Sequence, residues 1–295
     1  MGGVRDRIDV AWVSCRAIPE PDPDEEPALA ALRRAGLSIE TLAWDDPESA
    51  PPSRFSICVL RSCWNYYEDA PAFSRWIDQA DGASRLLNPP GFLHWNLHKG
   101  YLARLAEGGI PIVPTVFLER GSRPRFDGLL SRENWRDVVI KPAVSAGSFA
   151  TRRFREDQAH EAQDFLEQHL ACRDMLMQPF VQSVDTVGEK CLVWIDGAFT
   201  HAVIKQPKFD GQAGAVSGAL PVDEACAALG HAALACACDE VGLALSDLLY
   251  ARVDIVEHDR EWVIGELELL EPSLYLLQSP AALERFVRAL AALCK

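Results

Sequence analysis

Residues 252–272 read RVDIVEHDREWVIGELELLEP, two apolar runs that carry acidic side chains at regular intervals. Apolar and polar residues alternate along both runs, which is the pattern of strands with one buried face. A three-residue loop at 259–261 would join them as a hairpin with Asp254 opposite Glu266. The polar face of this predicted hairpin carries four side chains, Arg252, Asp254, Glu266 and Glu268.

Carboxylates opposed across two strands stand about 5 Å apart and repel each other. A bound cation would offset this repulsion, and ligands that offer only oxygen favour Mg²⁺ or Mn²⁺. Mg²⁺ usually takes one or two carboxylates together with phosphate oxygens, which indicates a nucleotide-metal site. We therefore predict Asp254, Glu266 and Glu268 as metal ligands. A solvated acidic strand would show the same pattern, and a four-residue loop would shift Asp254 away from Glu266.

A buried-strand pattern, VVIKP, occupies residues 138–142 and leads through Lys141 into a loop of small residues. A cation beside free backbone N–H groups suits the oxygens of a polyphosphate. The candidate loop contacts are Ser145, Gly147 and Ser148. An ordinary turn with a solvated lysine would explain this segment equally well.

Two further lysines occupy positions suited to a phosphate site. Lys99 opens a predicted helix, and Lys205 ends a hairpin whose turn, Asp196-Gly197, is a strong hairpin signal. With a regular register Lys190, His201 and Lys205 share one face. Each lysine alone is explained by a surface charge, so the prediction depends on their joint placement.

Residues 175–181 read MLMQPFV, an apolar strand with one amide. Pro179 lacks a backbone N–H and restricts this strand to an edge or a hinge. Gln178, Pro179 and Phe180 could therefore lay free backbone groups against a purine. An edge strand of the core is the alternative interpretation.

The N-terminal part begins with a β-α-β pattern: strands at Ile8–Val13, Ile39–Trp44 and Phe55–Arg61, and a helix at Pro27–Gly36. Parallel strands joined in this way predict an open α/β sheet, which binds ligands beyond the carboxyl ends of its strands. The segment Arg61–Tyr66 lies there.

The turn at 88–91, NPPG, indicates a domain boundary. We expect three parts: an α/β domain at 1–95, a central region with a small α+β lid at 96–177, and a C-terminal α+β part at 178–295. The other predicted strands are 113–118, 138–141, 175–181 and the two hairpins. The other predicted helices are 97–108, 156–170, 223–241 and 281–294.

Composition narrows the choice of partners. The net charge of -14 repels nucleic acid and anionic lipids. There is no apolar stretch, near the N-terminus or elsewhere, that is long enough to cross a bilayer. The nine cysteines include no CxxC pair and predict reduced thiols. We expect a cytoplasmic protein, with a homodimer as its assembly.

Taken in order, these segments resemble the ATP-grasp superfamily, in particular its prokaryotic glutathione-synthetase-like branch. The motifs that carry the resemblance are Asn96–Tyr101, Val139–Pro142, Gln178–Phe180, His201–Lys205, Arg252–Asp254 and Glu266–Glu268. The resemblance spans nearly the whole chain and implies an ATP-grasp fold behind a Rossmann-like N-terminal domain. Arg61–Tyr66 also looks like a branch of cyclo-ligases, as in cycloserine biosynthesis.

The resemblance implies a role for each candidate residue. Lys99 and Lys141 would contact the phosphates of ATP, with the loop Ser145–Ser148 closing over them. Gln178–Val181 would form the adenine-side hinge, and Lys205 would lie by the γ-phosphate. Asp254, Glu266 and Glu268 would bind two magnesium ions, and Lys205 and Arg252 would be catalytic. The candidate substrate contacts are Arg61, Trp64, Asn65 and Tyr66.

Two departures from the glutathione-synthetase pattern stand out. Glu268 occupies a position where Asn is frequent, which keeps an oxygen ligand and adds charge. The phosphate loop and the stretch Phe209–Leu220 contain less Gly than is usual, so glutathione is not implied as the product.

The predicted activity is that of an ADP-forming ligase, which activates a small carboxylate as an acyl phosphate and joins it to an amine within or between molecules. Magnesium and lysines would offset the repulsion between the carboxylate and ATP. The sequence contains no GxxxxGK[ST] or GxGxxG motif, which argues against a P-loop kinase and a dinucleotide oxidoreductase. A kinase on the same fold and a nucleotide-binding regulator without turnover remain the alternatives.

Overall fold

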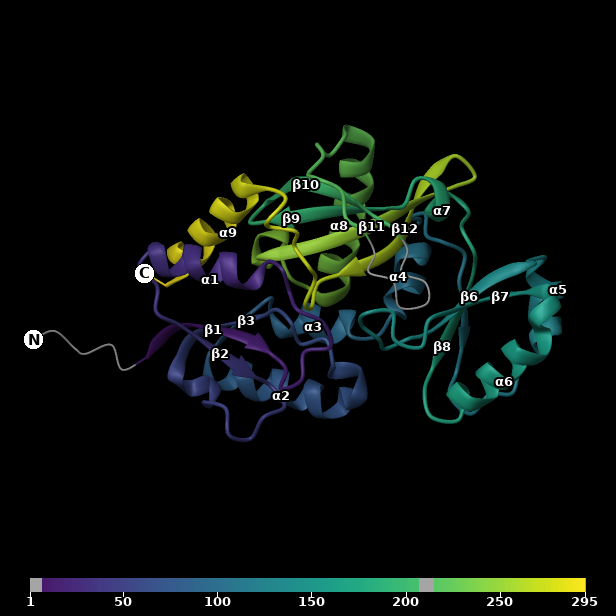
Figure 1. Ribbon diagram of the computed structural model, residues 1–295, viewed down its shortest axis with the longest axis horizontal. Helices are drawn as coiled ribbons and strands as arrows, with labels where there is room; N and C mark the ends of the chain where they lie inside the picture. Colours follow the sequence, from purple (N-terminus) through teal and green to yellow (C-terminus); the bar gives the residue numbers. More distant parts are fainter. Residues whose placement is uncertain (1–6, 207–214, 295) are drawn as a thin grey trace, which may run out of the picture.

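Three four-stranded sheets, with helices packed around them, make up the protein (Figure 1). The computed structural model describes residues 7–206 and 215–294. The N-terminal sheet lies at the lower left of Figure 1, the C-terminal sheet at the top, and a smaller sheet extends to the right. Among the described residues every helix is too short or too polar to span a bilayer.

The N-terminal sheet is parallel, with strand order β2-β1-β3-β4. Its elements are β1 (Ile8–Ser14), α1 (Glu25–Arg34), β2 (Ile39–Ala43), β3 (Phe55–Leu60), α2 (Ala70–Ala83) and β4 (Arg85–Leu87). The predicted β-α-β start is confirmed, and each strand ends within one residue of its expected bound. The backbone N–H of Arg61 still donates to the Val13 carbonyl at 2.9 Å, so the segment after β3 leaves the sheet at its carboxyl edge.

The helix predicted over residues 97–108 is confirmed as α4 (Tyr101–Glu107), which begins four residues later than expected. A further helix, α3 (Pro90–Asn96), comes before it. In the turn between them the backbone N–H of Gly100 donates to His98 Nδ1 at 2.9 Å, a local bond that competes with helix continuation. Lys99 lies in this turn, and its backbone N–H donates to the Ala143 carbonyl at 2.8 Å. The break therefore places Lys99 beside the predicted phosphate loop.

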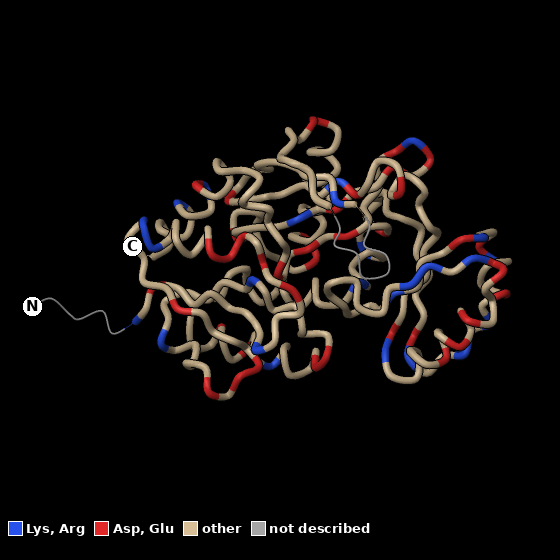
Figure 2. Tube along the Cα trace, viewed as in Figure 1, with Lys and Arg blue, Asp and Glu red and all other residues tan. Residues whose placement is uncertain are grey.

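The small sheet is antiparallel, with strand order β5-β8-β6-β7. Its elements are β5 (Val116–Leu118), α5 (Phe126–Glu133), β6 (Asp137–Pro142), β7 (Arg152–Arg155), α6 (Ala159–Leu170) and β8 (Met175–Pro179). The sequence did not predict α5 or β7. For β7 the reason is its sequence RRFR, a basic run (Figure 2) in which only Phe154 is buried. The boundary expected between 177 and 178 falls inside β8.

The C-terminal sheet is antiparallel, with strand order β10-β9-β11-β12. Its elements are α7 (Ser183–Thr186), β9 (Glu189–Ile195), β10 (Ala198–Lys205), α8 (Glu224–Val241), β11 (Tyr250–His258), β12 (Glu261–Glu268) and α9 (Pro280–Leu293). Both predicted hairpins are confirmed. Asp196 and Gly197 have φ values of 45° and 89°, as a two-residue hairpin turn requires.

A β-bulge alters the first hairpin. The register of β9 and β10 shifts between Phe199 and His201, so Lys190 pairs with Ile204 and Lys205 pairs with Glu189. Residues paired across two strands share a face and successive residues alternate. Lys190 therefore faces away from His201 and Lys205, and the prediction of one shared face is wrong.

The second hairpin reaches the predicted pairing by another route. Its turn has two residues, Asp259 and Arg260, because His258 pairs with Glu261. A bulge between Asp254 and Ile255 then restores the register, so that Asp254 pairs with Glu266 and Arg252 with Glu268. The expected three-residue loop is wrong, whereas the polar face that it implied is confirmed.

The N-terminal and C-terminal sheets share one hydrophobic cluster, which includes Trp12 of β1, Val193 of β9 and Phe286 of α9. The hydroxyl of Tyr250, at the start of β11, lies 2.8 Å from the Leu60 carbonyl. This packing holds the carboxyl end of the parallel sheet against the start of the strand that carries the acidic cluster.

Candidate active site

The three predicted metal ligands come together at the β11–β12 bulge. Asp254, Glu266 and Glu268 each offer an oxygen, and these atoms lie within 4.8 Å of one another. Asp254 is fully buried, and the two glutamates are partly buried. Three carboxylates at this spacing form the oxygen-only donor set that Mg²⁺ and Mn²⁺ prefer.

Two of the predicted phosphate lysines lie beside Glu266. Lys141 Nζ donates to Glu266 Oε1 at 2.9 Å, and Lys99 Nζ lies 3.9 Å from the same oxygen. Lys99 Nζ also donates to the Ser145 carbonyl at 3.0 Å. Both lysines therefore lie between the acidic cluster and the loop, where they can reach a phosphate group.

Lys205 and Arg252 approach the other side of the cluster. Lys205 Nζ lies 2.5 Å from Glu189 Oε2 and 3.9 Å from Asp254 Oδ2. Arg252 donates through Nε and Nη2 to the two oxygens of Asp254, both at 2.7 Å, and through Nη2 to Glu268 Oε1 at 2.5 Å. This bidentate contact fixes the orientation of Asp254.

The two glutamates respond differently to their surroundings. Burial alone would raise the pKa of Glu266, but Lys141 and Lys99 outweigh it and hold that pKa well below its usual range. Burial raises the pKa of Glu268 to about 8, an effect that Arg252 offsets only in part and Asp254 reinforces. Burial beside Asp254 thus disfavours the charged form of Glu268, a cost that a cation bound to these carboxylates would offset.

The predicted phosphate loop adopts an unusual backbone. Gly147 and Ser148 have φ values of 57° and 61°, and Ala150 has 49°. The Ser145 carbonyl accepts from Lys99 Nζ and from the hydroxyl of Tyr66, both at 3.0 Å. Residues 207–214, which include the first part of the stretch Phe209–Leu220, lie outside the described residues.

The predicted adenine hinge lies at the end of β8. Gln178 is buried, and its Nε2 donates to Thr115 Oγ1 at 2.8 Å. Thr115 in turn donates to the Val113 carbonyl at 2.7 Å. These two bonds fix the amide of Gln178. Pro179 is the last residue of β8 and pairs with Val138.

Phe180 follows directly. The guanidinium carbon of Arg153 lies 3.3 Å from the centre of its ring, and Arg153 also binds Asp137 through two short hydrogen bonds, at 2.9 and 2.6 Å. The hinge is therefore attached to β7 through Arg153.

Arg61 occupies an interior position. It is 1% exposed, and its guanidinium lies 5.6 Å from the Trp12 ring and 5.4 Å from the Tyr250 ring. Its Nε and Nη1 have no hydrogen-bond partner among the described residues. That it binds a substrate carboxylate stays a prediction.

The other three predicted substrate residues tie their segment to its neighbours. Trp64 Nε1 donates to the carbonyl of Glu271, in the segment that follows β12, at 3.1 Å. Asn65 accepts from Trp44 Nε1 at 2.8 Å and donates to Asp45 at 2.7 Å. Asn65 therefore supports the segment, while Trp64 connects it to the chain that follows β12 and Tyr66 connects it to the loop.

Sequence reasoning missed several residues of this site. They are Glu189, which pairs with Lys205, Thr115, which orients Gln178, buried Glu271, and Tyr275, whose ring lies 5.6 Å from the guanidinium of Arg252. Glu189 was detectable, because it opens the strand opposite Lys205. Thr115 and Tyr275 come from connecting segments whose positions only the fold determines.

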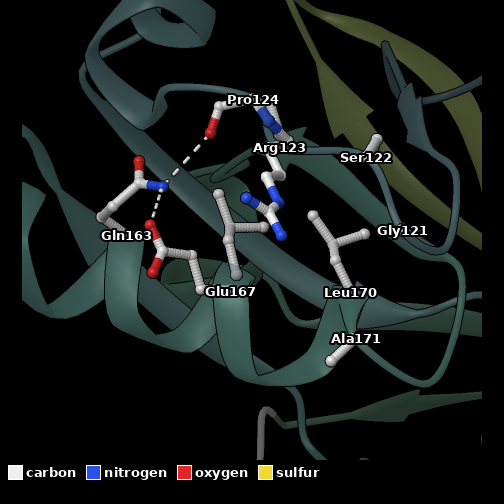
Figure 3. A pocket seen from close by; sticks show the side chains of 9 residues that line it. Gly121, Ser122, Arg123, Pro124, Gln163, Glu167, Leu170 and Ala171 are labelled. Carbon is white, nitrogen blue, oxygen red and sulfur yellow. Dashed lines mark hydrogen bonds between the residues drawn. The ribbon is translucent and has the colours of Figure 1, made fainter.

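A separate hollow of about 440 Å³ lies on the small sheet's outer helix (Figure 3). It is lined by residues 121–124 and by side chains of α6, among them Gln163 and Glu167. No predicted site residue lines it, so it is separate from the candidate active site.

Comparison with known proteins agrees with this arrangement. Residues 10–88 match the family model of the N-terminal domain of D-cycloserine synthetase DcsG. Over 281 residues the chain is 34% identical to the cycloserine biosynthesis protein DcsG of Streptomyces lavendulae, covering 92% of this chain and 93% of that protein. The chain belongs to the DcsG family. The crystal structure of D-cycloserine synthetase DcsG superposes on it with a TM-score of 0.87 and 33% identity, over 97% and 99% of the two chains.

More distant structures extend the likeness in fold. D-alanine–D-alanine ligase from Bacillus anthracis has a TM-score of 0.68 at 12% identity, over 97% of each chain. The ATP-grasp ligase PsnB has a TM-score of 0.66 at 15% identity, over 98% and 99% of the two chains. The ATP-grasp fold predicted from the sequence is confirmed, and this DcsG-family chain is an ATP-dependent ligase of the ADP-forming, carboxylate–amine type.

Proposed function

We propose that this ligase activates a small, amino-acid-like carboxylate as an acyl phosphate and closes it onto an amine of the same molecule. The observation that carries the proposal is the acidic cluster of Asp254, Glu266 and Glu268, with oxygens within 4.8 Å of one another and lysines on two sides. Mg²⁺ or Mn²⁺ on these oxygens would neutralise the phosphates of ATP during transfer. Ring closure is supported by the relatives, which are named for cycloserine, a cyclic compound.

Each basic residue has a distinct task in this proposal. Lys141 and Lys99 would exchange Glu266 for phosphate oxygens, with the loop Ser145–Ser148 adding backbone N–H groups. Lys205 would stabilise the transferring phosphoryl group, and Arg252 the reacting carboxylate. The side chains hold the reactants and offset charge, so no protein nucleophile is needed.

The two ends of the site would bind the two substrates. Gln178, Pro179 and Phe180 would bind the adenine, at the end of β8. Arg61, Trp64, Asn65 and Tyr66 would form the acid's side, since this segment contacts both the metal strand and the phosphate loop. The cytoplasmic location and the homodimer stay predictions from the sequence.

Magnesium-dependent ADP release, measured over a panel of amino acids and small dicarboxylates, tests this function. Hydroxylamine should trap an acyl phosphate as a hydroxamate with the active acid. ADP release that gives a phosphorylated product and no hydroxamate would instead identify a kinase. Nucleotide binding without ADP release for any acid would identify a regulator.

The metal assignment is tested by Glu266→Gln and Asp254→Asn. Each should lower ADP release at least about hundredfold, because a metal ligand loses its charge. Glu261→Gln is the matched control, an exposed carboxylate on the same hairpin, and should leave ADP release unchanged. Normal turnover in both ligand variants would show that the metal binds elsewhere.

A further inference from the structure

Phe149, which directly follows the predicted phosphate loop Ser145–Ser148, is held between two parts of the molecule. Its ring stacks on Tyr67 with centroids 4.2 Å apart and planes 20° apart. The guanidinium of Arg173 lies 5.0 Å from its centre. Tyr67 belongs to the segment after β3 of the N-terminal sheet, whereas Arg173 precedes β8 of the small sheet. One side chain thus touches a connecting segment of each of the two neighbouring sheets.

The backbone around Phe149 is strained. Ser148 and Ala150, its two neighbours, have φ values of 61° and 49°, a left-handed region that costs free energy for residues other than glycine. Such backbone persists only where surrounding contacts enforce it. The stacked ring is the contact placed between the two strained residues.

A second contact joins the same two segments. The Tyr66 hydroxyl donates to the Ser145 carbonyl at 3.0 Å, which Lys99 also contacts. The adjacent residues Tyr66 and Tyr67 therefore contact Ser145 and Phe149, which lie four positions apart. Trp64, in the same segment, reaches the Glu271 carbonyl at the end of the metal strand.

We propose that Tyr67 and Phe149 are positioning residues that hold the phosphate loop against the N-terminal domain. The inference rests on the proposed function for the loop's role at the triphosphate, and on the stack itself for the loop's position. Tyr67 directly follows the predicted substrate segment Arg61–Tyr66. The same stretch of chain would therefore position both a carboxylate bound to that segment and the loop over ATP. The loop would then be ordered only when the N-terminal domain and the small sheet are packed together, and the reaction would require this ordered loop.

Hydrogen exchange of the peptide spanning 143–151 tests the stack directly in the nucleotide-free protein. Tyr67→Ala should increase exchange of this peptide about two- to tenfold, the range that an aromatic pair contributes. Tyr67→Phe keeps the ring and should behave as the wild type. Phe149→Ala should increase exchange at least as much as Tyr67→Ala, because it also removes the Arg173 contact. The double variant should show no further increase over Phe149→Ala, because the two rings act as one contact.

Nucleotide binding gives the second measurement. With AMP-PNP and Mg²⁺ as the probe, the Kd should rise about two- to tenfold in Tyr67→Ala and stay unchanged in Tyr67→Phe. Loop exchange in Tyr67→Ala equal to that of the wild type would overturn the proposal, as would additive effects in the double variant. Faster exchange throughout the chain would assign Tyr67 to overall stability and overturn it too.

These results separate the two proposals. If no variant and no wild-type protein binds AMP-PNP, the proposed function fails while the exchange measurement still decides the stack. If ADP release depends on Glu266 but hydrogen exchange of the loop peptide is unchanged in Tyr67→Ala, the positioning role of the stack is wrong and the proposed function stands.

Discussion

At the scale of single residues, the site is built from side chains that orient other side chains. Gln178 gives its N–H to Thr115, and Thr115 gives its hydroxyl hydrogen to the Val113 carbonyl. The amide is therefore fixed with its oxygen directed away from Thr115. If the predicted hinge binds a purine through this amide, an acceptor there would suit the amino group of adenine and not the carbonyl of guanine.

Replacing Thr115 by Val tests this orientation. The shape is retained, but Gln178 Nε2 loses its acceptor, and the amide becomes free to rotate and donate. We expect the preference for ATP over GTP, measured as the ratio of kcat/KM values for nucleoside diphosphate release, to fall roughly tenfold. Thr186→Val, which removes a hydroxyl of α7, should leave the ratio unchanged. An unchanged ratio in Thr115→Val would show that the Gln178 amide does not select the base.

At the scale of elements, irregularities in the strands decide which side chains meet. The bulge in β11–β12 aligns Asp254 with Glu266, and the bulge in β9–β10 pairs Lys205 with Glu189. Bulges re-aim side chains at functional sites. Without either one, the acidic cluster and its lysine would lie on different faces.

Gly188 lies at the open end of the β9–β10 hairpin, and its replacement by Ala tests how closely it packs against β10. Its φ is 90°, and an added Cβ would stand 2.6 Å from Ile204 Cγ2 and 2.9 Å from the Lys205 carbonyl oxygen. We expect Gly188→Ala to lower the free energy of unfolding by about 2–4 kcal/mol. Thermal unfolding should show a Tm lower by about 2–4 °C for each kcal/mol.

Gly36→Ala provides the matched control. Its φ is 89°, and an added Cβ would meet nothing within 4 Å, so only the backbone conformation is penalised. We expect a loss of about 1–2 kcal/mol. Equal losses at both positions would contradict the tight packing at Gly188.

At the scale of the whole molecule, Tyr250 connects the two halves. Its ring is fully buried, and its hydroxyl lies 2.8, 3.3 and 3.0 Å from the carbonyl oxygens of Leu60, Leu87 and Leu270. These residues end β3, end β4 and follow β12. One hydroxyl therefore joins the carboxyl edge of the parallel sheet to the strand that carries the metal ligands.

Tyr250→Phe should lower the free energy of unfolding by about 1–3 kcal/mol, because the one hydroxyl hydrogen that donates to this group of buried carbonyls is lost. The Tm should fall by roughly 2–12 °C, which thermal unfolding followed by circular dichroism measures. Tyr67→Phe, at a half-buried tyrosine, is the control and should leave the Tm unchanged. A Tm for Tyr250→Phe equal to that of the wild type would mean that these carbonyls do not depend on the hydroxyl.

The sequence predicted most elements, because their patterns are local. Alternation identified β11 and β12, and the Asp196-Gly197 turn identified the first hairpin. It missed β7, whose arginines pair with acidic residues distant in the sequence, such as Asp137. It also missed the break before α4, which depends on a histidine that bonds the backbone.

The sequence by itself determined the fold family and the chemical types of the site residues, since carboxylates, lysines and one arginine at strand ends follow from residue type and spacing. Only the tertiary structure decided which of them meet. Register depends on bulges, whose extra residue leaves little local signal. Thr115, Glu271, Tyr275 and the Tyr67–Phe149 stack lie where segments distant in the sequence pack together, and such contacts are created by the fold.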